Sequence, residues 1–397
     1  MIRQLLQKNV RDFIEQHAQD DEQQLLLKHK VVEDVPVSLI AWQISGKRKA
    51  KIKLPLYHNT KGIVYPPGIN LEQSSSQQTA EFKVSVLTEV ISSKKLLIDL
   101  TGGFGVDSFF FSNVFESVQY IEPNAELIEY AKHNHEMLGA KNILYNNTTA
   151  ETFLRSGKEK ANCVFIDPSR RTGTQKVVKL SDCEPDVTRL LPEIFNISSF
   201  LLIKSSPLLD VQQGIKELQF VRSVWIVSVE NECKELLFLC EKDYAGEPII
   251  HAVNLDAIQE KFSFTFAGER NSTADFSDPL AYLYEPNASI LKAGAFKQVA
   301  VEFSLSKLHP STHLYTSKNL IENFPGRTFK VRGVLKSDSK LVAAAFPSGK
   351  ANVLTRNYPL SPDALKKKLK LKDGGEDYLI GCSGEKKKFL IAAMRLK

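Results

Sequence analysis

Three acidic residues, Asp99, Glu122 and Asp167, each stand at the end of a short run rich in apolar residues. Runs of this kind, bounded by turn residues, are typical of strands in a parallel sheet that is covered on both faces. The carboxyl ends of parallel strands meet at the edge where α/β proteins bind ligands. Carboxylates at that edge can accept hydrogen bonds from hydroxyl or amino groups, or accept a proton. We therefore predict that the three carboxylates face one crevice.

A glycine-rich turn follows the first predicted strand, with the sequence Asp-Leu-Thr-Gly-Gly-Phe-Gly at 99–105. Glycine lets the backbone turn sharply and lets a ligand approach where a Cβ would otherwise stand. The helix expected after the turn would direct its free N–H groups at that ligand. A dinucleotide-binding turn would have a third glycine three residues after Gly105, but this position is Ser108. A tight turn without a ligand also fits this segment on its own.

Glu122 ends the second predicted strand, at 117–121, and is a candidate ribose ligand. A carboxylate in this place can accept hydrogen bonds from both ribose hydroxyls of a nucleoside. The alternative is a surface residue that stabilises the positive end of the helix expected to begin near 123–124. The glycine turn earlier in the chain favours the ribose contact.

The turn at 99–105, Glu122 and the sequence Asp-Pro-Ser-Arg-Arg at 167–171 occur in the order of a known family. Over roughly residues 72–242, the chain resembles the class I S-adenosylmethionine-dependent methyltransferases. Thr101 stands where the loop of that family has its first glycine. The resemblance implies S-adenosyl-L-methionine as methyl donor and requires no metal.

A narrower resemblance rests on segments 72–83, 204–207 and 232–235 together with a basic C-terminal region. These features are similar to those of a bacterial group of methyltransferases with a C-terminal THUMP-like domain. That domain is named for its likeness to a tRNA-binding module. The resemblance therefore implies an RNA substrate, with tRNA favoured.

The family resemblance also implies which residues bind the cofactor. Asn147 or Thr149 would replace an acid that contacts adenine in many relatives, and a segment before the first strand would cover the cofactor. For that covering segment, a helix N-terminus with capping serines is an equal alternative. The predicted cofactor-binding residues are Asp99, Thr101, Gly103, Gly105, Glu122, Asn147, Thr149, Gln73 and Thr79, with Ser76 as a further candidate.

The sequence at 167–171 is the second strong motif. Methyltransferases that modify bases often carry Asp/Asn-Pro-Pro-aromatic here, but Ser169 and Arg170 replace the second proline and the aromatic residue. Arginine can stack on a base or bind a phosphate through two hydrogen bonds. Asp167 could position the methyl acceptor or take its proton. We predict Asp167, Arg170 and Arg171 as the catalytic residues, with a structural Asp-Pro turn as the alternative.

The composition is that of an ordinary globular protein, with 43% apolar and 25% charged residues in a chain of 397. This length indicates two or three domains. The five cysteines are scattered without a Cys-x-x-Cys pair, which argues against a zinc site and a disulfide framework. No run approaches the roughly 20 apolar residues that span a bilayer. The first residues lack the apolar core of an export signal, so we expect a cytoplasmic protein.

The charge is unevenly distributed. Residues 291–397 hold 21 Lys+Arg and 8 Asp+Glu, a net charge of +13, and since the whole chain carries +6, residues 1–290 carry −7. A basic domain on an acidic body is typical of a protein that binds a polyanion. Aromatic residues are sparse among these lysines, so we expect contacts to the backbone or shape of RNA. A soluble lysine-rich surface is the alternative.

We predict an α/β fold centred on a Rossmann-like methyltransferase domain with a seven-stranded sheet. The predicted domains are an N-terminal helical cap at 1–71, the methyltransferase domain at 72–244, a connecting α+β domain at 245–322, with a ferredoxin-like fold as one option, and a basic THUMP-like domain at 323–397.

Two smaller assignments follow from local pattern alone. The basic run at 46–53 is predicted to be a loop or strand with a solvated face. His133 and His135 lie two residues apart on a predicted helix, so they point to different faces and make a poor metal pair. We expect both to be surface residues.

The predicted activity is methyl transfer from S-adenosylmethionine to RNA. One alternative is a methyltransferase for a small molecule or a protein, whose basic domain serves folding or oligomerisation. Another is an RNA-binding protein that keeps the fold without turnover.

Overall fold

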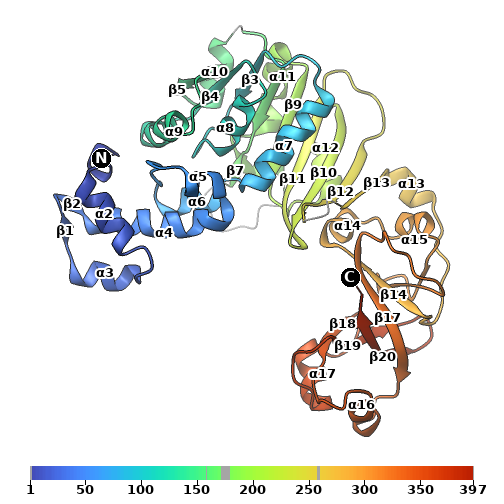
Figure 1. The fold of residues 1–397 in the computed structure, drawn as a ribbon. Helices are drawn as coiled ribbons and strands as arrows, with labels where there is room; N and C mark the ends of the chain where they lie inside the picture. The colour runs from blue at the N-terminus through green and yellow to red at the C-terminus, as the bar shows by residue number, and fades with distance from the viewer. Residues whose placement is uncertain (1, 158, 171–178, 257–259, 397) are drawn as a thin grey trace. The chain divides into compact units, whose positions relative to one another are not determined.

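The computed structural model describes residues 2–157, 159–170, 179–256 and 260–396. The chain forms two compact units, and each is described by itself (Figure 1). Unit 1 comprises residues 1–222 and 236–246, and unit 2 comprises residues 223–235 and 247–397. Among the described residues, no helix combines the length and apolar character that a membrane crossing requires.

Unit 1 begins with a group of short helices. Their buried face is built from Val10, Ile14, Ile40 and Ile44, and Tyr130 from a later helix packs into the same cluster. The predicted N-terminal helical region is therefore present, and it packs against the rest of unit 1. Its elements are α1 (Ile2–Leu5), α2 (Lys8–Gln16), α3 (Glu22–Lys28), the hairpin β1 (Val31–Val32) and β2 (Val35–Pro36), α4 (Val37–Lys53), α5 (Pro55–Asn59) and α6 (Gly68–Gln73).

The basic run at 46–53 lies inside α4, so the predicted loop or strand was wrong. Lysine and arginine are good helix formers. Three of the basic side chains pair with acids from neighbouring segments, although Lys49 and Lys51 remain exposed. These pairs are Lys47 with Glu15, Arg48 with Glu22 and Lys49 with Glu72.

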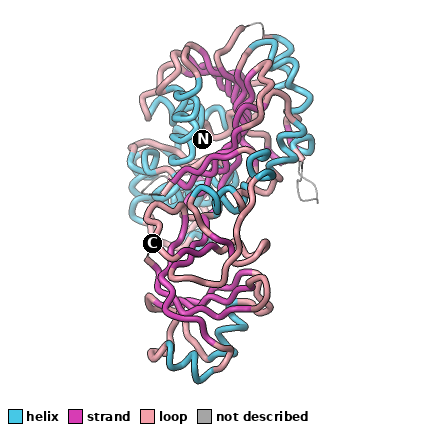
Figure 2. The backbone as a smooth tube through the Cα atoms, turned by 90° about the vertical axis from the view of Figure 1, so that its right-hand side faces the viewer, coloured by secondary structure: helices cyan, strands magenta, loops and turns pink. Residues whose placement is uncertain are grey.

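A mainly parallel sheet forms the centre of unit 1. Strand β3 pairs in parallel with β4 and β6, β4 pairs with β5, β6 pairs with β9, and β11 is antiparallel to β9. All residues of β3 and β6 are buried, which requires cover on both faces. Figure 2 shows the strands of unit 1 running between helices on either side. The strands in unit 1 are β3 (Leu96–Asp99), β4 (Ser117–Ile121), β5 (Ile143–Asn146), β6 (Cys163–Ile166) and β9 (Phe200–Ser205). The sheet continues with β11 (Glu232–Glu241), whose residues 236–241 belong to unit 1, and β10 (Val221–Val229), whose residues 223–229 belong to unit 2.

These seven strands correspond one for one to the seven predicted from the sequence. Over the residues that the structure describes, the sheet has nine strands, because β12 (Ile249–Asn254) and β13 (Glu260–Phe264) follow β10. The accompanying helices are α7 (Gln77–Val90), α8 (Val106–Ser112), α9 (Ala125–Met137), α10 (Ala150–Ser156), α11 (Val187–Ile197) and α12 (Val211–Glu217).

The direction of strand addition changes beside β3. The chain proceeds from β3 to β4 and β5 on one side, and from β6 to β9 on the other. In open α/β sheets, ligands bind outside the carboxyl ends of the strands at such a switch point. A ligand site is therefore expected beside the residues that follow β3, β4 and β6.

Unit 2 contains a second sheet, with strand order β15-β16-β14-β17-β20-β19-β18. Strand β14 pairs with β17, so the predicted connecting and basic regions share this sheet. Its strands are β14 (Tyr282–Pro286), β15 (Ser306–Lys307), β16 (Tyr315–Ser317), β17 (Gly326–Leu335), β18 (Asn352–Arg356), β19 (Asp377–Ser383) and β20 (Lys388–Arg395). The helices of unit 2 are α13 (Phe266–Asn271), α14 (Ala288–Ala293), α15 (Gln298–Glu302), α16 (Ser339–Ala345) and α17 (Pro362–Leu369).

Candidate active site

The glycine turn joins β3 to α8, and each glycine has a different surrounding. Gly103 and Gly105 have φ angles of +54° and +86°, a left-handed conformation that favours glycine. A Cβ on Gly102 would lie 2.2 Å from the Tyr120 ring, and one on Gly105 would lie 2.6 Å from His135 Nε2. A Cβ on Gly103 would have no atom nearer than 3.8 Å. The turn is thus packed against protein at two glycines and open at Gly103.

Asp99 shapes this turn from inside. The carboxylate accepts a hydrogen bond from the Thr101 backbone N–H (3.0 Å) and one from the Ser108 hydroxyl (2.5 Å). The side chain is 1% exposed, and burial raises the pKa of this carboxyl to about 7. Ser108, which stands where a dinucleotide turn would have glycine, is therefore a partner of the buried acid. The predicted contact of Asp99 with a cofactor stays a prediction.

The raised pKa of Asp99 predicts a pH-dependent stability. The folded protein keeps this proton up to about pH 7, whereas the unfolded chain loses it near the ordinary pKa of about 4. Asp99 therefore adds stability that is complete below about pH 4 and is lost as the pH rises through 7. Between pH 5 and 8, the unfolding free energy of the wild type should fall by about 2 kcal/mol relative to Asp99→Asn. Urea unfolding of both proteins measures this, and a constant difference across the range would contradict it.

Glu122 follows β4 and contacts the same turn. One carboxylate oxygen accepts from the Gly103 N–H (2.9 Å), and the other accepts from the N–H of Asn124 (2.8 Å), the residue that caps α9. The side chain is 9% exposed. Each carboxylate oxygen can accept a further hydrogen bond. Glu122 therefore joins the turn to the start of α9 and keeps acceptor capacity for a ligand.

Asp167 follows β6 and is tied to the turn through Thr101. The Asp167 backbone N–H donates to the Thr101 hydroxyl at 2.7 Å. Thr101, which replaces the first glycine of the family's loop, therefore links the turn to the residue after β6. The Asp167 carboxylate forms an ion pair with Lys204, near the end of β9. The structure therefore brings the three predicted acids together around one turn and adds Lys204 to them.

The two predicted arginines, Arg170 and Arg171, come after Asp167 in the sequence. Ser169 and Arg170 form the short strand β7, which pairs with β8 (Cys183–Glu184). Arg171 lies outside the described residues. The assignment of both arginines to catalysis stays a prediction.

Asn147 and Thr149, the two candidates for an adenine contact, differ in their bonding. The Asn147 amide donates to the backbone carbonyls of Glu122 (3.1 Å) and Pro123 (2.9 Å), which places this side chain beside the predicted ribose acid. The Thr149 hydroxyl caps α10 by accepting from the Thr152 N–H at 3.2 Å. The Asn147 side chain is thus the one of the two that bonds to the Glu122 backbone, and the adenine contact of either residue stays a prediction.

The residues predicted to cover the cofactor lie at the start of α7. Ser76 caps this helix by accepting from the Thr79 N–H at 3.2 Å, and the Thr79 side chain is 2% exposed. Gln73 ends α6 and is exposed. Ser76 and Thr79 thus have the capping geometry that the sequence offered as the alternative, and the cofactor contact of the exposed Gln73 stays a prediction.

A buried ion pair beside the turn was not predicted. Lys83 of α7 is fully buried, and its Nζ lies 3.1 Å from a carboxylate oxygen of Asp107 in α8. The Ser75 hydroxyl donates to the other oxygen of Asp107 (2.7 Å) and accepts from Lys83 (2.9 Å). This cluster fixes α7 against the helix that follows the glycine turn. In the sequence, the only indication that Lys83 could be buried is its place between the apolar residues Phe82 and Val86, both of which are buried in the structure.

Replacing Lys83 by methionine should destabilise the protein. The variant leaves Asp107 buried without its cation, and breaking such a pair costs about 3–5 kcal/mol of unfolding free energy. Urea unfolding measures the loss, with Lys132→Met, an exposed lysine on α9, as the control. Adding Asp107→Asn to Lys83→Met should restore part of the stability. A Lys83→Met variant as stable as the control would contradict a structural role for the pair.

His135 is a core residue, so its prediction as a surface residue was wrong. It is fully buried, its Nε2 lies 2.8 Å from the Gly105 carbonyl, and its Nδ1 lies 2.9 Å from the Tyr145 hydroxyl. Because the carbonyl only accepts, Nε2 carries the proton and Nδ1 accepts from Tyr145. Burial lowers the pKa of His135 to about 4, so the ring is neutral near pH 7. It holds the last glycine of the turn against α9.

Comparisons with known proteins point to methyltransferases. A family model described as RNA cap guanine-N2 methyltransferase matches residues 94–173, a ferredoxin-like domain model matches 282–325, and a THUMP domain-like model matches 326–395. A crystal structure from Porphyromonas gingivalis W83, named "putative methyltransferase", is 31% identical, covers 97% of both chains and superposes with a TM-score of 0.85.

Two curated relatives match over shorter parts. An uncharacterized RNA methyltransferase of Mycoplasma mobile is 27% identical over 138 residues, which is 35% of this chain and 38% of the relative. An uncharacterized S-adenosylmethionine-dependent methyltransferase of Mycobacterium tuberculosis is 23% identical over 250 residues, 61% of this chain and 64% of the relative. The chain thus spans less than two thirds of the length of each of these relatives.

Proposed function

The chain belongs to the class I S-adenosylmethionine-dependent methyltransferases, in one family with the Porphyromonas gingivalis protein, and we propose that it transfers a methyl group to RNA. The observation that carries this proposal is the junction of Gly103, Glu122 and Asp167 at the carboxyl ends of β3, β4 and β6. An open glycine beside the Glu122 carboxylate, which has spare acceptor capacity, fits a ribose, and a second carboxylate, that of Asp167, follows the neighbouring strand β6.

In the proposed site, Glu122 accepts hydrogen bonds from the ribose hydroxyls, and Gly103 leaves room for the cofactor. Asn147 offers its carbonyl oxygen to the adenine amino group, and Asp99 keeps the turn in shape. S-adenosylmethionine, when bound, supplies an electrophilic methyl group on its sulfonium. The described residues contain no cluster of three or more His, Cys, Asp or Glu side chains arranged for a metal ion. Because the sulfonium methyl group is already electrophilic, the protein contributes mainly orientation of the two reactants.

Asp167 is proposed to orient the acceptor. A carboxylate accepts hydrogen bonds, so its natural partner on a base is an exocyclic amino group. Lys204 holds the carboxylate in place and balances its charge. The match of residues 94–173 to a guanine-N2 methyltransferase model supports the guanine amino group as the acceptor.

The basic domain is proposed to hold the RNA, with tRNA as the favoured class. On and after α17, Lys367, Lys368 and Lys370 are exposed, and Lys340 and Lys350 are exposed near α16. Contacts between such lysines and phosphates release counterions, so RNA affinity should fall steeply as salt rises. The match of residues 326–395 to a THUMP domain-like model supports this role.

Methyl transfer to RNA from a strain that lacks the gene tests the proposal. The purified protein, with methyl-labelled S-adenosylmethionine, should label this RNA and leave RNA from the parent strain unlabelled, because the parent RNA already carries the modification. Mass spectrometry of the nucleosides then identifies the base, and fractionation identifies the RNA class. Label that enters only protein or small molecules would favour the alternative acceptors, and no label in any fraction would favour a non-catalytic RNA-binding role.

A further inference from the structure

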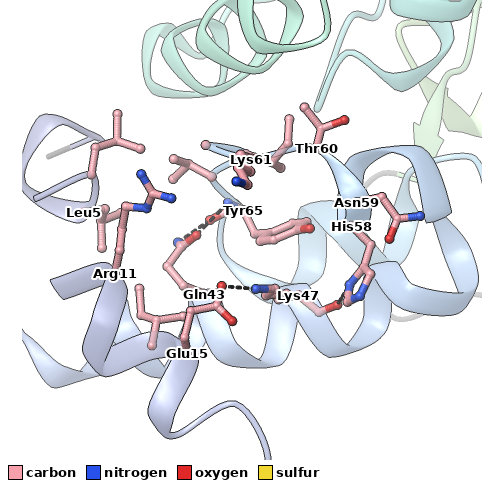
Figure 3. Close-up of a pocket in the computed structure, with 15 residues that line it drawn as sticks. Leu5, Arg11, Glu15, Gln43, Lys47, His58, Asn59, Thr60, Lys61 and Tyr65 are labelled. Atoms are coloured by element: carbon pink, nitrogen blue, oxygen red, sulfur yellow. Dashed lines mark hydrogen bonds and ion pairs between the residues drawn. The ribbon is translucent and has the colours of Figure 1, made fainter. Parts of the chain in front are cut away.

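A cavity of about 350 Å³ lies among the N-terminal helices of unit 1. Its walls come from α1, α2, α4, α5 and the segment 60–65 that follows α5 (Figure 3). None of the residues assigned to the methyl-transfer site lines it. The volume lies within the range of pockets that enclose small organic ligands, roughly 300–1,000 Å³.

The lining combines an apolar base with two available cations. The accessible apolar part comes from the partly exposed Leu6 and Ile63, together with the buried residues Leu5, Ile14 and Val64. Arg11 and Lys61 are exposed residues that line the same cavity from α2 and the 60–65 segment. Lys47 also lines it but is paired with Glu15, whereas Arg11 and Lys61 form no ion pair with any residue that the structure describes.

The walls are held in place by hydrogen bonds before any ligand arrives. The Gln43 side chain of α4 donates to the Tyr65 carbonyl (2.7 Å) and accepts from the Tyr65 N–H (2.7 Å), as the dashed lines in Figure 3 show. Asn134 of α9 makes the same pair of bonds to Val64, at 2.8 and 2.9 Å. His133 Nε2 lies 2.8 Å from the Gly62 carbonyl. The cavity is therefore preformed and needs little ordering on binding.

We propose that this cavity binds a phosphorylated nucleotide unit, with its phosphate held by Arg11 and Lys61 and its base against the apolar wall. Arginine binds phosphate through two parallel hydrogen bonds, and lysine adds a mobile point charge. A purely apolar ligand would leave both cations unused, and an inorganic anion would leave the apolar wall uncovered.

The position of the cavity links it to the methyltransferase part of unit 1. Its 60–65 wall is bonded to the last turns of α9, the helix whose first residues are held by Glu122 through Asn124. A nucleotide bound there is thus fixed relative to the proposed ribose site. The inference goes beyond the proposed function, because it assigns a second nucleotide site built from residues outside the crevice.

Calorimetric titration of the full chain tests the proposal with two probes, guanosine 5′-monophosphate and a short single-stranded RNA with a 5′ phosphate. The test variant is Arg11→Ala with Lys61→Ala. The matched control is Arg3→Ala with Lys8→Ala, which removes the same two charge types from exposed positions of the same helical region outside the cavity. S-adenosylmethionine affinity and thermal unfolding, measured in parallel, report whether each variant is folded.

The test variant should bind a probe at least about tenfold more weakly, whereas the control should bind like the wild type. If the test variant binds both probes more weakly, the cavity accepts a free nucleotide. If it binds only the RNA more weakly, the cavity takes a nucleotide of an RNA chain. Equal losses in the test and control variants, an unchanged affinity in the test variant, or no binding of either probe to the wild type would overturn the proposal. None of these outcomes depends on methyl transfer.

Discussion

Glu122→Ala is expected to weaken S-adenosylmethionine binding by about a hundredfold. The carboxylate holds the Gly103 N–H at 2.9 Å and the Asn124 N–H at 2.8 Å, and it is proposed to accept from the ribose. Hydrogen bonds to a charged group contribute about 1.5–3 kcal/mol each, and 1.4 kcal/mol corresponds to a tenfold change in affinity. Alanine removes the ribose contact and also loosens the turn that surrounds the cofactor. Calorimetric titration of the purified variant measures the loss.

Two controls separate a ribose contact from a general loss of structure. Glu126→Ala removes an exposed carboxylate from the first turn of α9 and should leave the affinity unchanged. A cofactor analogue without ribose hydroxyls should bind the wild type weakly, and Glu122→Ala should weaken it little further. An affinity of Glu122→Ala equal to that of the wild type would remove Glu122 from the site. An equal hundredfold loss for the analogue would make its role structural only.

The arrangement of the crevice could be predicted because each of its parts leaves a local signal. Apolar runs bounded by turn residues indicate buried parallel strands, and the carboxyl ends of such strands share one edge. The register of β3 places Asp99 beside Tyr120 of β4 and Phe165 of β6. Glu122 and Asp167 each follow one of these residues by two positions in the sequence. Strand type and order therefore sufficed to bring the three acids together.

Residues that depend on a distant partner could not be predicted in this way. The environment of His135 is set by the Gly105 carbonyl, and that of Lys83 by Asp107. Nothing in the spacing of the histidines or in the apolar face of α7 specifies either partner. A buried polar group is stable only where its hydrogen bonds are satisfied, so its burial follows from tertiary packing and not from local pattern.

The helix α4 illustrates the same limit at the level of secondary structure. Its basic run looked like a solvated loop because the compensating acids lie far away in the sequence, in α2, α3 and α6. Those pairs hold the N-terminal helices together, so the run has a structural use that a charge count does not suggest. Lys49 and Lys51 of this run nevertheless remain exposed, as do several lysines of the basic C-terminal region.

Asp167→Ala is expected to reduce methyl transfer to RNA by about a hundredfold or more while cofactor affinity stays within about twofold of the wild type. The proposed role of the carboxylate is to orient the acceptor, and loss of a positioned catalytic group typically costs about 10²–10⁴ in rate. The link from Asp167 to the turn uses its backbone N–H, which alanine retains. Single-turnover rates at saturating cofactor, with titration of the cofactor, measure the two effects separately.

Asp167→Asn distinguishes orientation from proton transfer. Asparagine keeps a carbonyl oxygen that accepts a hydrogen bond but is a very weak base. If Asp167 orients an amino group, the asparagine variant should retain most of the rate lost in Asp167→Ala. If it takes the proton, both variants should be slow to the same degree.

Lys204→Met completes this test, because Lys204 contacts the carboxylate through the ion pair. If Lys204 serves to hold an orienting carboxylate, Lys204→Met should slow methyl transfer and leave RNA affinity unchanged. If Lys204 binds an RNA phosphate, Lys204→Met should weaken RNA affinity. The three variants together decide whether this corner of the crevice performs the chemistry. If Asp167→Ala transfers methyl groups at the wild-type rate, the acceptor must be held elsewhere.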